Sequence, residues 1–137
     1  MKIKLDPGVT MPTRGHAEDA GLDLYSRDKM IWIAAHEQKL IDTGVHIELP
    51  QGYYGMVTGR SSMNKEGILC MTGIIDRGYT GSIGVILHNL NDHPVQILDD
   101  QRIAQLIIQP YFIPELELVS FLDDTERGDG GFGSTGR

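Results

Sequence analysis

The chain has 137 residues, with 12 lysines and arginines against 19 aspartates and glutamates, and a formal net charge of −7. This length predicts one domain rather than two, and the negative charge argues against broad nucleic-acid binding, which depends on Lys and Arg neutralising phosphates. The single cysteine, Cys70, excludes an intramolecular disulfide. The N-terminus lacks the apolar region of a secretory signal, and no apolar run approaches the roughly 20 residues that span a bilayer. We therefore expect a soluble, cytoplasmic protein.

Short runs of β-forming residues, separated by turn residues, follow one another along the chain. One helical turn is predicted over 61–66, with Ser61 or Ser62 as its N-cap. Many short strands at regular spacing predict an all-β domain, and the pattern leaves sandwich, jelly roll and small barrel open. The predicted strands are 20–25, 31–33, 39–45, 46–49, 53–58, 82–87, 95–98, 103–108 and 116–121.

The last twelve residues depart from this pattern. Residues 126–137 contain five glycines and one aromatic residue, so they cannot supply a core of their own. We expect a domain over 1–125 and a flexible tail over 126–137. A tail without function is the default for such a segment, although Arg127, Ser134 and Thr135 are of phosphate-binding type and Phe132 is suited to stacking on a base.

Two polar clusters in the first half of the chain are candidates for anion or metal chemistry. Asp23 lies between apolar neighbours in a predicted strand; taken alone, an exposed or hydrogen-bonded aspartate is the more frequent situation. Residues 59–62, Gly-Arg-Ser-Ser, precede the predicted helical turn, where N–H groups, hydroxyls and an arginine can bind an anion. An ordinary helix cap beside a solvated arginine explains the same residues equally well.

Two further clusters lie in the second half. Residues 73–81 contain three glycines and an Asp-Arg-Gly step, which predict a tight hairpin. There Asp76 could position and deprotonate water and Tyr79 could form a flat platform; the alternative is a decorated hairpin in which Asp76 only starts the turn. Gln105 is a lone polar residue within the apolar run 103–108, so its amide needs a partner from protein or ligand.

In their order and spacing these clusters resemble the five motifs of the trimeric dUTPase family, over nearly the whole chain from about Arg14 to Gly136. The most specific matches are Ile75-Asp76-x-x-Tyr79-x-Gly81, Arg102-Ile103-Ala104-Gln105-Leu106 and the tail from Arg127 to Gly136. The resemblance implies a jelly-roll-like β-barrel that assembles as a threefold homotrimer with active sites shared between subunits. It also implies hydrolysis of dUTP to dUMP and pyrophosphate with Mg²⁺, a step in nucleotide metabolism.

The resemblance assigns roles to individual residues. Asp76 would activate the water that attacks the α-phosphorus, and Tyr79 would sit under the deoxyribose. The backbone from Cys70 to Ile75 would read the uracil edge. Mg²⁺ would be held mainly by the substrate phosphates, with Asp23 acting through water, and the tail would close as a lid. The remaining substrate-binding residues implied are Arg60, Ser61, Ser62, Gly73, Ile75, Gln105, Arg127, Phe132, Gly133, Ser134 and Thr135.

Some positions depart from the family pattern. Ser62 stands where the second motif usually has glycine, and Gly59 where it usually has proline. Cys70 replaces an asparagine that contacts uracil in several members, so we expect base recognition to rest on main-chain groups. In the fourth motif Asp100 and Gln101 stand where glycine and an acidic residue are usual. None of these changes removes a proposed catalytic group.

Three rival interpretations of the function fit parts of the sequence. A dCTP deaminase, which shares the fold, needs a Glu three residues before an Asn; here that Asn is Asn89 and the earlier residue is Ile86. A zinc site at His88 and His93 lacks a third and fourth ligand nearby. A regulatory role, in which the trimer holds a protein partner, stays open as an additional or sole function, although the intact Asp76 and Tyr79 argue against it being the only one.

Overall fold

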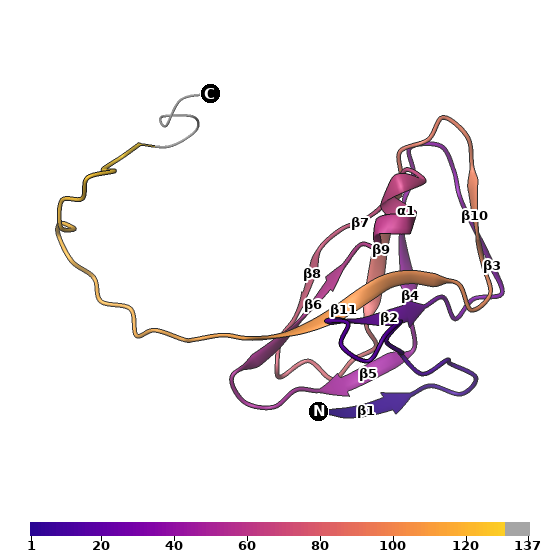
Figure 1. Cartoon of the computed structure of the whole chain (residues 1–137), viewed down its shortest axis with the longest axis horizontal. Helices are drawn as coiled ribbons and strands as arrows, with labels where there is room; N and C mark the ends of the chain where they lie inside the picture. Colours follow the sequence, from indigo (N-terminus) through magenta and orange to yellow (C-terminus); the bar gives the residue numbers. More distant parts are fainter. Residues whose placement is uncertain (131–137) are drawn as a thin grey trace.

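Eleven β-strands and one short helix make up the part of the chain that the structure describes, residues 1–130 of a computed structural model (Figure 1). The all-β prediction is confirmed, and no helix in this range is long and apolar enough to cross a membrane. The elements are β1 (Lys2–Leu5), β2 (Gly21–Tyr25), β3 (Met30–Ile33), β4 (Gln38–Asp42), β5 (Val45–Glu48), β6 (Tyr53–Thr58), α1 (Ser61–Lys65), β7 (Ile68–Cys70), β8 (Gly73–Ile75), β9 (Gly84–Asn89), β10 (Val95–Leu98) and β11 (Arg102–Pro110).

The longest strand, β11, connects the strands that carry or precede the predicted site residues. It pairs antiparallel with β2 on one side and with β6 on the other, and β8 completes a sheet of order β2-β11-β6-β8. In this register Gln105 lies opposite both Asp23 on β2 and Thr58 on β6. The sheet therefore brings three segments that are far apart in the sequence into one row.

Three smaller antiparallel sheets complete the body, with strand orders β4-β9-β7, β1-β5 and β10-β3. Within residues 1–130 the hydrogen-bonded ladders do not close into a single continuous barrel. The jelly-roll-like architecture expected from the sequence is thus built from separate sheets packed on a common core.

Alternating residues on these strands supply the core. On β9, for example, Val85 and Leu87 are fully buried, whereas Gly84, the first residue of the strand, is exposed. Burying an aliphatic side chain of this size stabilises a fold by about 1.5–3 kcal/mol, so these residues hold the sheets in the register that positions the site. The other buried aliphatic residues include Leu24, Ile33, Ile41, Val45, Val57, Ile68, Ile83, Ile97, Ile103 and Leu106.

Asn89, at the end of β9, is a buried polar residue whose amide is satisfied by the protein. Its Nδ2 donates to the carbonyl oxygens of Ile33, Ala34 and His93 at 3.1, 2.9 and 2.9 Å, and its Oδ1 accepts from the Asn91 backbone N–H at 3.0 Å. A buried amide needs such partners. Asn89 therefore fastens β9 to the end of β3, which is a structural role.

Two local predictions about the body of the fold were wrong. Residues 39–45 form two strands rather than one, because Gly44 adopts φ +66°, a left-handed conformation that glycine enters without a steric penalty. Residues 73–81 do not form a hairpin: β8 pairs with β6, whereas β9 pairs with β4 and β7. The segment instead crosses from one sheet to another.

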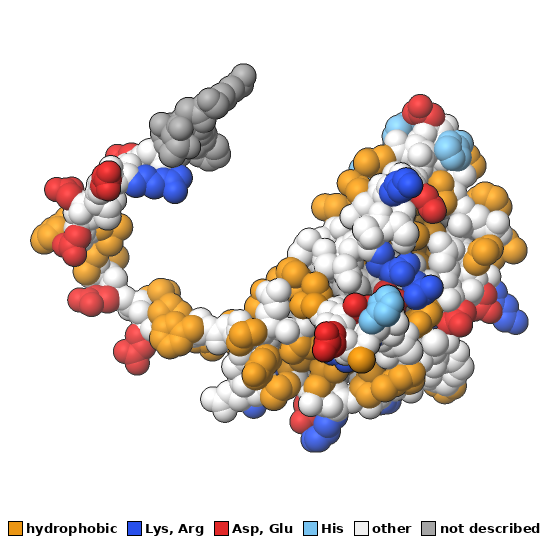
Figure 2. Space-filling model, in the orientation of Figure 1, with side chains coloured by type: hydrophobic (Ala, Val, Ile, Leu, Met, Phe, Trp, Pro, Cys, Tyr) orange, Lys and Arg blue, Asp and Glu red, His pale blue; other side chains and the backbone are white. Residues whose placement is uncertain are grey.

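The C-terminal arm, residues 111–130, contains no helix or strand and extends away from the sheets (Figure 1). The strand predicted over 116–121 is absent, although Leu116 and Leu118 alternate with polar residues as a strand would. A strand needs a neighbouring edge for its hydrogen bonds, and no other described strand lies against this one. Apolar side chains therefore follow the arm into solvent (Figure 2).

Candidate active site

A cavity of about 440 Å³ lies where β2, β11 and the start of α1 meet. It brings together five predicted site residues from three separate motifs, because the β2-β11-β6 register aligns those segments. Its polar lining residues include Asp23, Arg60, Ser61, Ser62, Arg102 and Gln105, together with His16 and Asp19 from the loop before β2. We call it the arginine cavity.

Asp23 is the buried centre of this cavity. Its side chain is 12% exposed, and both of its oxygens are bonded: Oδ1 accepts from Arg60 Nε at 2.8 Å and Oδ2 from Arg102 Nη1 at 3.3 Å. Removing a carboxylate from water is unfavourable unless cations and hydrogen bonds compensate it. Asp23 is therefore a hydrogen-bonded aspartate, and it holds two guanidinium groups at one wall.

The Arg60–Asp23 ion pair also explains how α1 begins. The N-cap is Arg60, in an extended conformation at φ −92° and ψ 139°, and no side chain caps the helix. The prediction of Ser61 or Ser62 as N-cap was wrong, because the ion pair to β2 fixes Arg60 outside the helix. Both serine side chains are exposed at the cavity, so their hydroxyls are free of a capping role.

Gln105 braces the cavity from β11. Its Nε2 donates to the Gly59 carbonyl at 2.9 Å, so the partner that the sequence required is provided at least in part by the protein. Its Oε1 lies over Gly21, where a Cβ would collide with it. The absence of a side chain at Gly21 is thus what allows Gln105 to reach the β6–α1 loop.

Asp76 and Tyr79 lie at a different place on the surface. Asp76 is exposed and lines a second hollow, of about 460 Å³, with Glu48, Arg77 and Tyr111. Its carbonyl accepts from the Tyr79 N–H at 2.9 Å, which closes a turn. Tyr79 is 46% exposed, its hydroxyl donates to the Ser82 carbonyl at 2.7 Å, and a Cβ at Gly81 would lie 2.6 Å from the ring. Gly81 therefore lets the ring fold back over the chain.

The sheet register separates these two places. Ile75 pairs with Gly55 near the start of β6, so Asp76 follows at that end, whereas Arg60 comes just after the other end of β6. At about 3.3 Å per residue, the intervening strand places the two groups on the order of 15–20 Å apart. Neither Asp76 nor Tyr79 lines the arginine cavity. One chain therefore presents the predicted site in two parts.

Cys70 and Ile75, on the segment predicted to read uracil, turn their side chains toward the protein. Burial raises the pKa of the Cys70 thiol to about 11, so the thiol is neutral at ordinary pH and unsuited to nucleophilic chemistry. Ile75 is buried in the core, and Gly73 pairs with Val57 on β6. Ligand contacts from Cys70, Gly73 and Ile75 would thus come from their backbone groups, whereas Met71 and Ile74 are 50% and 56% exposed.

The charges in the arginine cavity balance. Two arginines, Arg60 and Arg102, face two aspartates, Asp19 and Asp23. Within residues 1–130 no group of three His, Cys, Asp or Glu side chains is arranged to hold a metal ion. A polyanion bound here would therefore bring more negative charge than the described cavity offsets, and a metal held there would depend on oxygen ligands from that polyanion.

The comparison with protein families matches residues 8–136 to dUTPase. The chain belongs to the dUTPase family. Among curated proteins it is 44% identical over 135 residues to the mitochondrial deoxyuridine 5'-triphosphate nucleotidohydrolase of Homo sapiens, which covers 98% of this chain and 53% of that protein. It is 46% identical over 125 residues to the enzyme of the same name from Monkeypox virus, covering 91% and 82%. The chain thus spans about half the length of the human relative.

Solved dUTPase structures share this fold. The Staphylococcus bacteriophage 80alpha dUTPase with dUpNHpp matches at a TM-score of 0.93 and 31% identity, over 99% of this chain and 98% of that one. A mutant of the phage phi11 dUTPase, described as coordinating a structural Mg(II) ion, matches at a TM-score of 0.83 and 27% identity, over 90% and 98%. The dUTPase fold expected from the motifs is confirmed.

The remaining predicted site residues lie in the tail. Arg127 is exposed, and its Nε donates to the Gly130 carbonyl at 2.9 Å, within the tail itself. The other four, Phe132, Gly133, Ser134 and Thr135, lie outside the described residues. Their roles stay predictions.

Arg102 and Gly21 line the cavity but were given no individual role from the sequence. A register shift between Arg102 and Ala104 in the β11–β2 ladder accompanies the approach of the Arg102 side chain to Asp23. Strand periodicity carries no information about such an irregularity. The sequence showed the motif that contains Arg102, but it did not show the contact between Arg102 and Asp23.

Proposed function

We propose that this chain hydrolyses dUTP to dUMP and pyrophosphate, in a homotrimer whose active sites are shared between subunits. The observation that carries the proposal is the arginine cavity, in which the register of one sheet assembles Asp23, Arg60 and Arg102 beside exposed serine hydroxyls. Its residues are those of the family motifs, and a similar phage dUTPase binds the analogue dUpNHpp. The activity follows from this combination of cavity chemistry and family.

The cavity provides the triphosphate site. Arg60 and Arg102 present N–H groups in a fixed fork geometry, which suits phosphate oxygens. The side chain of Arg102 is 49% exposed, so it retains donors for a ligand beyond its bond to Asp23. Ser61 and Ser62 add hydroxyl donors, and Gln105 holds the loop that carries them and lines the cavity.

The exposed turn at Asp76 provides the general base that activates the attacking water, and it provides the platform for the sugar. Asp76 takes the proton of the attacking water, which adds to the α-phosphorus while pyrophosphate leaves. Proton transfer of this kind contributes roughly 10²–10⁴-fold to a rate. The Tyr79 ring packs beneath the deoxyribose, and its hydroxyl bond to Ser82 fixes the ring. A 2′-hydroxyl would collide with it, which discriminates against UTP.

A second copy of the chain brings the two parts together. In one chain Asp76, just after β8, lies near the start of β6, and Arg60 lies just after the end of β6, so a reacting phosphorus cannot contact both. The C-terminal arm supports assembly, because Leu116, Leu118 and Phe121 are 95%, 101% and 80% exposed. Apolar residues at strand spacing, without an edge to pair with, fit the sheet of a neighbouring subunit.

The donor set suits Mg²⁺ held mainly by the substrate. Asp23 is bonded to two arginines, so it fits a contact to Mg²⁺ through water rather than direct coordination. When bound, the ion would stabilise the charge on the leaving pyrophosphate. Asp23 meanwhile keeps Arg60 and Arg102 oriented toward the phosphates.

The tail completes the site as a lid. Phe132 stacks on uracil, while Arg127, Ser134 and Thr135 contact the γ-phosphate and Gly133 allows close approach. Stacking of this kind is worth roughly 1–3 kcal/mol per base. Arg127 also adds positive charge, which the balanced charges of the arginine cavity lack.

The test is pyrophosphate release in Mg²⁺, measured in parallel from dUTP, dCTP, dTTP and UTP. Release from dUTP alone, abolished by EDTA, is the expected result. A folded, trimeric protein that releases pyrophosphate from none of them would contradict hydrolysis and favour the regulatory, protein-binding role.

A further inference from the structure

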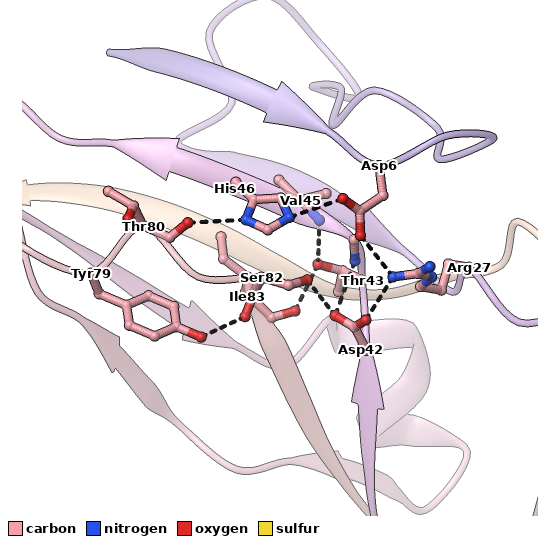
Figure 3. Close-up of polar contacts among 11 residues, drawn as sticks. Asp6, Arg27, Asp42, Thr43, Val45, His46, Tyr79, Thr80, Ser82 and Ile83 are labelled. Atoms are coloured by element: carbon pink, nitrogen blue, oxygen red, sulfur yellow. Dashed lines mark hydrogen bonds and ion pairs between the residues drawn. The ribbon is translucent and has the colours of Figure 1, made fainter.

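The turn that carries Tyr79 is fastened to the corner between β4 and β5 by a polar network (Figure 3). On one side the Ser82 hydroxyl donates to Asp42 Oδ1. On the other, the Thr80 carbonyl lies 3.0 Å from Nδ1 of His46 on β5. The segment directly after Tyr79 is therefore held at two points, Thr80 and Ser82, by side chains from another part of the chain.

His46 lies between two groups that accept hydrogen bonds. Its Nδ1 faces the Thr80 carbonyl, and its Nε2 lies 3.2 Å from Asp6 Oδ1. The other oxygen of Asp6, Oδ2, accepts from Arg27 Nη1 at 3.0 Å. A neutral imidazole has one N–H and can donate to only one of these acceptors, whereas the imidazolium donates to both. The geometry thus matches the protonated ring.

We propose that His46 is a positioning residue for sugar selection: its protonated ring donates to the Thr80 carbonyl and to Asp6, and so fixes the turn that places Tyr79. The inference rests on the proposed function, in which Tyr79 packs beneath the deoxyribose.

A short series of bonds connects His46 to the phenol of Tyr79. Thr80 is bonded covalently to Tyr79, and the Tyr79 hydroxyl donates to Ser82, two residues beyond Thr80. The segment from Tyr79 to Ser82 is thus closed on itself and anchored at two points. Rejection of one extra hydroxyl depends on a platform whose position is held by such supporting bonds.

One arginine links the two anchors. Arg27 Nη1 donates to Asp6 at 3.0 Å and to Asp42 at 2.7 Å, so the carboxylate that faces His46 and the carboxylate that holds Ser82 share a cation. Loss of the His46 contact leaves the Thr80 carbonyl without this donor but leaves the Asp42 anchor in place. The expected result is a displaced Tyr79 in a folded protein.

The charges around the ring come from several elements. Lys4 on β1 is the cross-strand partner of His46 and lines the same hollow of about 310 Å³ as Thr80. Asp6 attracts the imidazolium charge, whereas the ammonium of Lys4 repels it; Arg27 and Asp42 lie beyond Asp6. Both bonds need the protonated ring, because a neutral ring has one N–H and keeps only one of them. Discrimination against UTP should therefore weaken at high pH.

The test compares kcat/KM for dUTP with kcat/KM for UTP in the full-length protein, from about pH 5.5 to about pH 8.5, which spans ordinary histidine titration. The ratio cancels pH effects on the common chemistry at Asp76. In the wild type the ratio should fall with pH, by about tenfold, as expected for a hydrogen bond from a charged donor. His46→Ala should show the lower ratio at every pH.

His46→Gln provides a second variant, since its amide can donate to Thr80 but does not titrate. Its ratio should be independent of pH, and its melting temperature reports on folding. The matched control is His93→Gln, an exposed histidine in the β9–β10 loop, which should keep the wild-type ratio and pH profile.

The outcomes separate this inference from the proposed function. A wild type without dUTP hydrolysis, or an unchanged ratio in Tyr79→Ala, would overturn the function or the role of Tyr79. A Tyr79→Ala ratio that falls, while folded His46→Ala and His46→Gln keep the wild-type ratio and pH profile, would overturn the role of His46 alone.

Discussion

The arginine cavity and the C-terminal arm differ in whether their side chains find partners within the same chain. In the cavity, Asp23 is buried and bonded to two arginines of its own chain. In the arm, residues 111–130, large apolar side chains such as Leu118 are fully exposed, and the described strands offer them no partner. The first region is complete within one chain, whereas the second is suited to contacts with another. The difference indicates which parts of the site a single subunit can build.

The largest expected effect comes from Asp76, an exposed residue outside the arginine cavity. Asp76→Asn should lower kcat by about 100-fold or more while leaving dUTP binding and the melting temperature nearly unchanged, because Asp76 is exposed and its backbone closes the turn. Steady-state kinetics and calorimetric titration measure the two quantities. A variant that keeps more than about a tenth of the wild-type kcat would show that Asp76 is not the base.

Truncation before Arg127 tests whether the far end of the arm serves catalysis alone. The shortened chain should fold and assemble but lose most of its activity, because stacking by Phe132, worth roughly 1–3 kcal/mol, and the charge of Arg127 are both removed. Light scattering and pyrophosphate release measure assembly and activity. Full activity in the shortened protein would contradict the lid.

Leu118→Asp tests the inner part of the arm. The side chain is fully exposed in the single chain, so a monomer would tolerate the charge, whereas burial of an unpaired carboxylate between subunits is strongly unfavourable. We expect a smaller assembly by light scattering and reduced activity at low protein concentration. Leu98→Asp, at an exposed leucine on β10 within the body, makes the same change of charge away from the arm and serves as the control. Unchanged assembly in Leu118→Asp would exclude the arm from the interface at that residue.

Asp23→Asn removes the two ion pairs of the arginine cavity, both of which form within one chain. It leaves two arginines without their carboxylate, and loss of one partner of a buried ion pair typically destabilises a protein by 3–5 kcal/mol. Because Arg102 is half-exposed, a smaller loss of about 2–3 kcal/mol is expected. Urea unfolding measures it. A variant as stable as the wild type would mean that solvent satisfies both arginines.

The smallest effect concerns the network that supports Tyr79. Burial raises the pKa of Asp42, but hydrogen bonds from Ser82 and the Gly44 N–H, with the charge of Arg27, outweigh it and hold the pKa below its ordinary value of 3.8. A depressed folded pKa contributes stability that is present above the unfolded pKa and is lost as pH falls through the folded value. Asp42→Asn should therefore flatten the stability profile below about pH 4. An identical acid profile in both proteins would assign that loss to other carboxylates.

The success of the predictions from the sequence differs between the arginine cavity and the C-terminal arm. Strand spacing and turn residues located β6 and β10 at their observed bounds, and the motifs identified Asp23, Arg60 and Gln105 before their contacts were known. The pairing of Arg102 with Asp23 was not predictable, because it accompanies a register irregularity between β11 and β2. The strand predicted over 116–121 was wrong for a different reason: alternation shows that a segment suits a sheet, but not whether its own chain offers an edge.

The most direct test of a shared active site is complementation between two inactive variants. Arg60→Ala removes the cavity side of the site, and Asp76→Asn removes the base; each should be inactive as a homotrimer. Co-expressed and purified as mixed trimers, they should regain dUTP hydrolysis, because some sites then combine an intact Arg60 from one subunit with an intact Asp76 from another. Mixed trimers, verified by mass spectrometry, that remain as inactive as either variant alone would contradict an active site assembled between copies of this chain.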